Sequence, residues 1–227
     1  EAGRAGIAFV PGIEITAARR GRDVHVLGYF LDPASPALRA FLEAQIADRI
    51  RRAREVGERL AALGAPIDVE ALIARLNGQP LLRPHIAAAL VDAGHAADGV
   101  EAFDRFIGEG KPAYVPRRGA TPAEVVARIH EAGGIASMAH PGVTHVDPLI
   151  PRLAADGLDA IEAYHTDHPA DETARYLAMA RDLGLAVSGG SDFHGHRSEH
   201  SNGFGSVHLP APDYAAFCGR AGRRTGG

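Results

Sequence analysis

The sequence predicts an α/β protein with an inserted helical segment. Three observations support this fold class. From residue 111 onward, short apolar runs typical of strands alternate with segments of helical periodicity. Residues 35–110 show helical signals without strand signals. His and Asp residues follow several of the apolar runs, where the strands of an α/β fold would end. We therefore expect an α/β body from residues 1–34 and 111–227, with residues 35–110 as a helical insertion.

The N-terminal part is predicted to form two strands, each with one ionisable residue. Residues 7–16 have the composition of a strand, in which Glu14 lies between two isoleucines. Residues 24–30 form the next predicted strand, with His25 embedded in it. A lone histidine in an apolar strand is usually a core residue. Neighbouring strands could nevertheless turn Glu14 and His25 toward one metal ion.

The insertion is predicted to begin with an amphipathic helix over residues 35–63, whose apolar residues recur at three- and four-residue steps. Four arginines lie mostly on its other face: Arg49, Arg51, Arg52 and Arg54. We interpret this as a solvated face, and a nucleic-acid contact is the alternative. Shorter helices are predicted over residues 68–75, 84–91 and 99–107.

Basic residues in and just after this insertion could bind a phosphate group. Pro84 is typical of a first helical turn, which puts Arg83 and His85 at a helix N-terminus that favours an anion. The planar fork of arginine matches phosphate geometry. An ordinary exposed helix start is the alternative. Lys111, the one lysine among 24 Lys and Arg residues, and Arg118 belong to an extended basic stretch that follows.

The second half is predicted to contain successive strand–helix units. Thr121 and Glu124 form a capping-box pattern around Pro122, which predicts a helix from there to about residue 132. Strands are predicted over residues 135–139, 158–164, 185–188 and 203–209, and further helices over residues 147–157, 170–183 and 212–221.

Three of these strands are followed by potential metal ligands. His140, His165 and the pair Asp192 and His194 follow successive strands. The carboxyl ends of parallel strands meet at one face, so a shared site is favoured over scattered core histidines. With Glu14 and His25, the histidines and carboxylates suit Zn, Mn or Fe, and more than one ion is plausible. Added to the basic residues, they predict a metal-dependent phosphoester hydrolase.

Composition excludes some classes. The net charge of −4 predicts no general affinity for nucleic acid, and no apolar run approaches the roughly 20 residues of a membrane span. The single Cys218 fits a reducing compartment, for which we expect the cytoplasm.

Five motifs resemble, in order, those of the polymerase and histidinol phosphatase (PHP) family. They are Gly12-Ile13-Glu14-Ile15-Thr16, His25-Val26-Leu27-Gly28-Tyr29, Arg83-Pro84-His85-Ile86-Ala87, Ala139-His140-Pro141-Gly142 and Gly190-Ser191-Asp192-Phe193-His194-Gly195. The resemblance covers nearly the whole chain. It is strongest to stand-alone metal-dependent phosphoesterases with a helical insertion, some acting on nucleoside 3′,5′-bisphosphates and others on the 5′ ends of short RNA.

The resemblance implies a distorted (β/α)7 barrel of the TIM type with up to three divalent metals, Mn, Zn or Fe, at the carboxyl ends of its strands. Glu14 would bridge two metals, and His25 and His140 would join it on one of them. Asp192 would serve the second metal and His194 the third. In such enzymes a bridging hydroxide attacks phosphorus.

The resemblance also implies a small phosphorylated substrate, such as a nucleotide or short oligonucleotide, with no membrane partner and no stable nucleic-acid complex. The substrate phosphate would contact Arg83, His85, Lys111 and Arg118. His165 or His168 would protonate the leaving oxygen or bind substrate. We favour His165 for catalysis because it ends a strand, which leaves His168 for substrate binding.

The family carries two motifs on its first two strands, His-x-His and Thr-Asp-His-Asp, and neither occurs before Gly12. Because the remaining ligands are intact, we expect a fragment that lacks its first two strand–helix units, not a degenerate enzyme. Three alternatives stay open. They are a metal hydrolase of an amide or lactone, a non-catalytic metal-binding domain, and a nucleic-acid-binding module that uses the arginine-rich helix.

Overall fold

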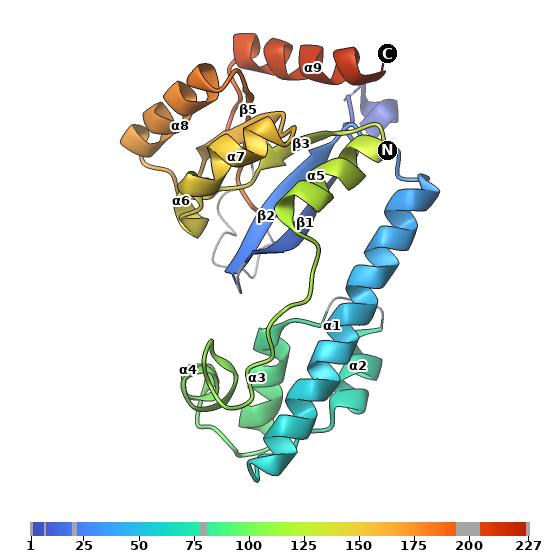
Figure 1. The fold of residues 1–227 in the computed structure, drawn as a ribbon, viewed down its shortest axis with the longest axis vertical. Helices are drawn as coiled ribbons and strands as arrows, with labels where there is room; N and C mark the ends of the chain where they lie inside the picture. The colour runs from blue at the N-terminus through green and yellow to red at the C-terminus, as the bar shows by residue number, and fades with distance from the viewer. Residues whose placement is uncertain (1, 7, 20–21, 78–80, 194–204, 226–227) are drawn as a thin grey trace. The chain divides into compact units, whose positions relative to one another are not determined.

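The structure, a computed structural model, describes residues 2–6, 8–19, 22–77, 81–193 and 205–225. The chain divides into two compact units. Unit 1 comprises Glu1–Ala40 and Ala120–Gly227, and unit 2 comprises Phe41–Gly119. Unit 1 contains the sheet, and unit 2 is helical in its described part (Figure 1).

The sheet of unit 1 has five strands in the described residues, in the order β1-β2-β3-β4-β5. β1 and β2 form an antiparallel hairpin, β2 pairs antiparallel with β3, and β3, β4 and β5 are parallel. Their bounds are Gly12–Arg19, Arg22–Tyr29, Ile135–Met138, Ala160–His165 and Ala186–Gly190. The predicted mixed α/β class is confirmed. The three parallel strands end at one edge of the sheet, and His140, His165 and Asp192 lie at or just beyond those ends.

Helices pack on this sheet (Figure 1). α5 contacts the first three strands, α8 contacts β4 and β5, and α9 contacts β3 and β5. α5 begins as predicted, because Thr121 Oγ1 accepts the Glu124 N–H and the Glu124 carboxylate accepts the Thr121 N–H. The bounds of the helices are α5 Pro122–Glu131, α6 Pro141–Thr144, α7 Ile150–Ala155, α8 Ala170–Asp182 and α9 Ala211–Thr225.

Unit 2 has its own apolar core, in which Leu60 and Leu90 are fully buried. The predicted long helix is confirmed as α1. It begins in the last residues of the first segment of unit 1 and continues into unit 2. Its bounds and those of the shorter elements are α1 Pro36–Ala62, α2 Val69–Leu76, α3 Arg83–Asp92, α4 Gly99–Ala102 and the π-helical turn Phe103–Ile107. On the basic face, Arg51 pairs with Asp48 and Glu55, and Arg54 pairs with Glu70. These pairs favour a solvated helix face over a nucleic-acid contact.

Two predicted strands differ from the structure. The strand predicted over residues 7–16 begins only at Gly12, because pairing with β2 sets its ends. The strand predicted over residues 203–209 was wrong in its described part, since residues 205–209 pair with no strand. The helix predicted over residues 147–157 is a 3₁₀ turn, Asp147–Leu149, followed by α7. Within the described residues, no helix has both the length and the apolar character that a membrane crossing needs.

Candidate metal centre

The β1–β2 hairpin brings Glu14 and His25 together. Thr16 pairs with His25 across the hairpin, and Glu14 lies two residues before Thr16. Because side chains alternate along a strand, Glu14 and His25 are diagonal neighbours on one face of the hairpin. His25 Nδ1 is hydrogen-bonded to Glu14 Oε1. Both side chains keep about a third of their surface exposed, at 30% and 31%.

His140 completes a group of three potential ligands. It follows β3, and its Nε2 lies 3.5 Å from Glu14 Oε1. One ligand atom from each of Glu14, His25 and His140 lies within 4.8 Å of the others. His140 is buried, and its Nδ1 has no hydrogen-bond partner among the described residues. The structure therefore brings together three ligands that lie up to 126 positions apart in the chain.

The backbone of His140 is strained. Its φ is +23°, a region that residues other than glycine rarely adopt and that clusters at functional sites. Two hydrogen bonds hold this segment: Ala139 N–H donates to His25 O at 3.1 Å, and His140 N–H donates to Glu162 Oε2 at 2.8 Å. The backbone at His140 is thus held from both neighbouring strands.

The charges of these groups are coupled. Hydrogen bonds from His140 and His25 hold the pKa of Glu14 far below its usual range. Burial lowers the pKa of His140, but the Glu14 hydrogen bond and nearby carboxylates outweigh burial and raise it overall. Burial raises the pKa of Glu162 to about 7. The cluster therefore combines an anionic Glu14 with a buried second carboxyl group beside it.

His165 ends β4 next to His140, with ring centroids 5.6 Å apart. Its Nδ1 accepts the Asp167 N–H at 3.1 Å, so in a neutral ring the proton belongs on Nε2. Nε2 is buried without a partner in the described part of the chain. Burial and the neighbouring His168 and His140 lower the pKa of His165 to about 4. This ring is therefore a neutral donor at pH 7.

His168 uses both ring nitrogens within the protein. Nδ1 is bonded to Ala163 O at 3.1 Å, and Nε2 accepts the Gly142 N–H at 3.3 Å. The ring packs between His165 and Tyr176, and the residue is 7% exposed. In this structure His168 joins β4 to the start of α6, the helix that directly follows His140.

Asp192 lies two residues beyond β5, with φ +50°. Its negative charge contributes to the raised pKa of both His140 and Glu162, which puts it within electrostatic range of the cluster. The neighbouring predicted ligand His194 lies outside the described residues.

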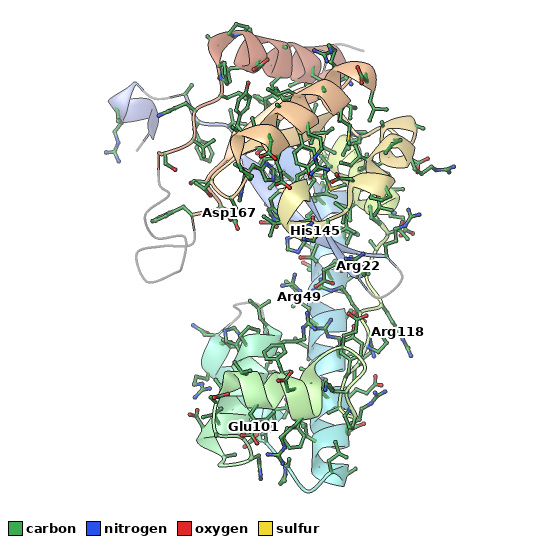
Figure 2. The ribbon with its side chains drawn as sticks, turned by 90° about the vertical axis from the view of Figure 1, so that its left-hand side faces the viewer. Arg22, Arg49, Glu101, Arg118, His145 and Asp167 are labelled. Atoms are coloured by element: carbon green, nitrogen blue, oxygen red, sulfur yellow. The ribbon has the colours of Figure 1, made fainter. Side chains whose placement is uncertain are left out.

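The four predicted phosphate-binding residues all belong to unit 2. Arg83 begins α3 and lies over the Phe103 ring, with 5.9 Å between the guanidinium carbon and the ring centre. His85 Nδ1 accepts the Leu82 N–H at the same helix end. Lys111 and Arg118 are exposed on the segment that follows α4 and its π-helical turn. Figure 2 shows the Arg118 side chain.

Sequence reasoning missed Glu162. The available signal was an acidic residue flanked by apolar residues inside a predicted strand, since Glu162 lies between Ile161 and Ala163 as Glu14 lies between two isoleucines. The side chain is buried in β4, with its carboxyl group between His140 and β5. A Cβ added at Gly190 would lie 3.0 Å from Glu162 Oε1.

Comparisons with known proteins show what the whole chain is similar to. No family model matches the chain. It is 33% identical over 201 residues to the 5′-3′ exoribonuclease Rnm of Salmonella typhimurium, covering 86% of this chain and 69% of that protein. It is 35% identical over 199 residues to the 3′,5′-nucleoside bisphosphate phosphatase of Chromobacterium violaceum, covering 85% and 70%.

A solved structure is also similar. A metal-dependent phosphoesterase from Bifidobacterium adolescentis superposes with a TM-score of 0.76 at 30% identity, over 96% of this chain and 79% of that one. The sheet, the clustered ligands in this structure and the similarity to these relatives together define the class of protein. It is a metal-dependent hydrolase of phosphoric ester bonds. The chain belongs to the PHP family of metal-dependent phosphoesterases.

Proposed function

We propose that Glu14, His25 and His140 hold a divalent cation and that the chain uses it to hydrolyse a phosphate ester of a nucleotide. The observation that carries this proposal is the convergence of one carboxylate oxygen and two imidazole nitrogens within 4.8 Å, at the carboxyl edge of the parallel strands. Asp192 and His194 are the ligands we propose for further ions.

The three residues fit such an ion. Two ligand atoms on one tetrahedral ion, each about 2.1 Å from it, lie about 3.4 Å apart. The 3.5 Å between His140 Nε2 and Glu14 Oε1 agrees with that spacing. The depressed pKa of Glu14 keeps it in the anionic form that a cation needs. Mixed nitrogen and oxygen donors favour Mn, Zn or Fe.

A divalent ion supplies positive charge to a phosphoryl oxygen and lowers the pKa of water. The chain supplies orientation. Glu162 fixes the backbone of His140, and His168 fixes the start of α6. His165 Nε2, a buried donor without a partner in the described residues, suits a hydrogen bond to a phosphoryl or leaving-group oxygen. Such a preorganised donor stabilises charge that develops in the transition state.

The substrate class follows from the relatives. One is named for 5′-3′ exoribonuclease activity and another for a nucleoside 3′,5′-bisphosphate, so we propose a nucleoside bisphosphate or the 5′ end of a short RNA. Arg83, His85, Lys111 and Arg118 are the cations we propose for its phosphates. We further propose that the five strands form part of a distorted seven-stranded barrel, and that the protein acts in the cytoplasm, in keeping with its single cysteine.

The test combines metal analysis with hydrolysis. Metal-free protein is loaded with Mn or Zn, its metal content is measured, and release of phosphate from adenosine 3′,5′-bisphosphate is followed. His140→Ala is expected to lose bound metal and at least about 100-fold in kcat/KM, because an ion held by two remaining ligands is weakly bound. His208→Ala, which removes an exposed histidine of unit 1, is the matched control.

Retention of metal and activity in His140→Ala would contradict the proposed ligand set. An unmodified chain that binds metal but hydrolyses no phosphate ester would contradict the catalytic proposal and leave a metal-binding domain.

A further inference from the structure

We propose that unit 1 carries a second, metal-independent binding site for a nucleoside monophosphate, on the face of the β1–β2 hairpin opposite the metal centre. The site is a cavity of about 340 Å³. It is lined by Arg19, Arg22, Val24, His145, Val146, Pro148 and Leu149. The phosphate-binding chemistry follows from the structure alone, whereas the choice of a nucleotide rests on the proposed function.

Strand register separates this cavity from the metal centre. Arg19 pairs with Arg22 across the hairpin, and Ala17 pairs with Val24. Side chains alternate along a strand, so Val24 and His25 point to opposite faces. Glu14 and His25 share one face, while Arg19, Arg22 and Val24 share the other. The cavity is therefore not an extension of the metal centre.

The charged side of the cavity suits a phosphate. Arg19 and Arg22 are cross-strand partners, and within the described residues neither guanidinium forms an ion pair or a side-chain hydrogen bond. The lining contains no carboxylate. His145 adds a third nitrogen donor group. Figure 2 shows Arg22 and His145 on the same edge of unit 1. Paired guanidinium groups bind phosphate through parallel N–H···O bonds.

The remaining wall is apolar, which a phosphate alone would not require. Val24 and Val146 are buried, and Pro148 and Leu149 extend the wall toward solvent. The volume is within the roughly 300–1,000 Å³ of small-molecule sites, which combine an apolar wall with a few polar groups. His145 is the C-cap of α6 (φ +53°), and its backbone N–H donates to Pro141 O, which fixes the position of the residue beside the cavity. A phosphate joined to a base matches both walls, and nucleoside monophosphates are the product class of the proposed reaction.

The test is calorimetric titration of the full chain with adenosine 5′-monophosphate, adenosine and inorganic phosphate in the presence of a chelator, so that the metal centre contributes no affinity. We expect AMP to bind at least 10-fold more tightly than either fragment. The double variant Arg19→Ala/Arg22→Ala should lower AMP affinity at least 10-fold. Arg181→Ala, which removes an exposed arginine of α8, should leave it unchanged.

A further variant tests the apolar wall. Leu149→Ser should weaken AMP binding and leave phosphate binding unchanged. Unaltered AMP affinity in the double arginine variant would overturn the site, and equal affinities for AMP and phosphate would overturn the nucleotide assignment. Phosphate release with added Mn is measured separately, so loss of the proposed hydrolysis and loss of this second site are distinguishable.

Discussion

The carboxylate of Glu162 accepts the backbone N–H of His140 at 2.8 Å. This contact joins the middle of β4 to the strained residue that follows β3. It fixes the peptide from which the His140 ring reaches Glu14. Because outer hydrogen bonds of this kind orient metal ligands, Glu162 should govern metal affinity without being one of the three clustered ligands.

Replacing Glu162 tests this relationship. Glu162→Ala should weaken Mn or Zn binding about 10- to 100-fold, the usual cost of losing an outer-shell partner. Glu162→Gln keeps an acceptor oxygen of the same reach and should restore most of the affinity. Equilibrium dialysis of metal-free protein measures both. Glu131→Ala, an exposed carboxylate on α5, is the control. Equal losses in the Ala and Gln variants would argue for a role of the charge itself.

A methyl group at Gly142 should disturb α6, the helix that directly follows His140. A Cβ there would lie 2.3 Å from Glu172 Oε2 and 2.9 Å from the His168 ring. Gly142→Ala should therefore destabilise the fold by about 1–3 kcal/mol, as overpacking does, and reduce metal affinity. Urea unfolding measures the first effect. Gly99→Ala meets no atom within 4 Å and should change stability little.

The basic residues of unit 2 distinguish a phosphoesterase from an amide or lactone hydrolase. Arg83→Ala and Lys111→Ala should each raise KM for a nucleoside bisphosphate about 10-fold or more, since a charge-assisted bond contributes roughly 1.5–3 kcal/mol. Steady-state kinetics gives the split between KM and kcat. Arg75→Ala is a control in α2 of the same unit. Unchanged kcat and KM in both Arg83→Ala and Lys111→Ala would show that these residues do not belong to the proposed substrate site.

His165 should make the metal-free protein sensitive to mild acid. Burial and neighbouring histidines lower its pKa from 6.5 to about 4 in the folded chain, so between these values the unfolded chain binds more protons. The contribution of His165 to the free energy of unfolding is therefore fully present above pH 6.5, and it is lost as the pH falls toward 4. Melting temperatures across this range should fall less steeply for His165→Gln. Parallel curves for the two proteins would contradict the assignment.

Much of the local structure was predictable because it depends on local chemistry. The capping box at Thr121 and Glu124 sets the start of α5, and three- and four-residue apolar steps define α1. The positions of His140 and His165 were predictable too, since apolar runs mark where β3 and β4 end. The strand predicted over residues 203–209 failed because an apolar run becomes a strand only beside a partner, and its described part has none.

The sequence by itself determined which residues could bind a metal, that Glu14 and His25 would lie in strands, and that His140 and His165 would lie at strand ends. Tertiary structure decided which of them meet. Register in the β1–β2 hairpin makes Glu14 a neighbour of His25, and pairing of β2 with β3 brings His140 to both. The role of Glu162 likewise depends on its position beside the end of β3. A one-residue change of register would turn these side chains to the opposite face. The pairing of β2 with β3 joins segments on either side of the helical insertion, and no local pattern in the sequence encodes that contact.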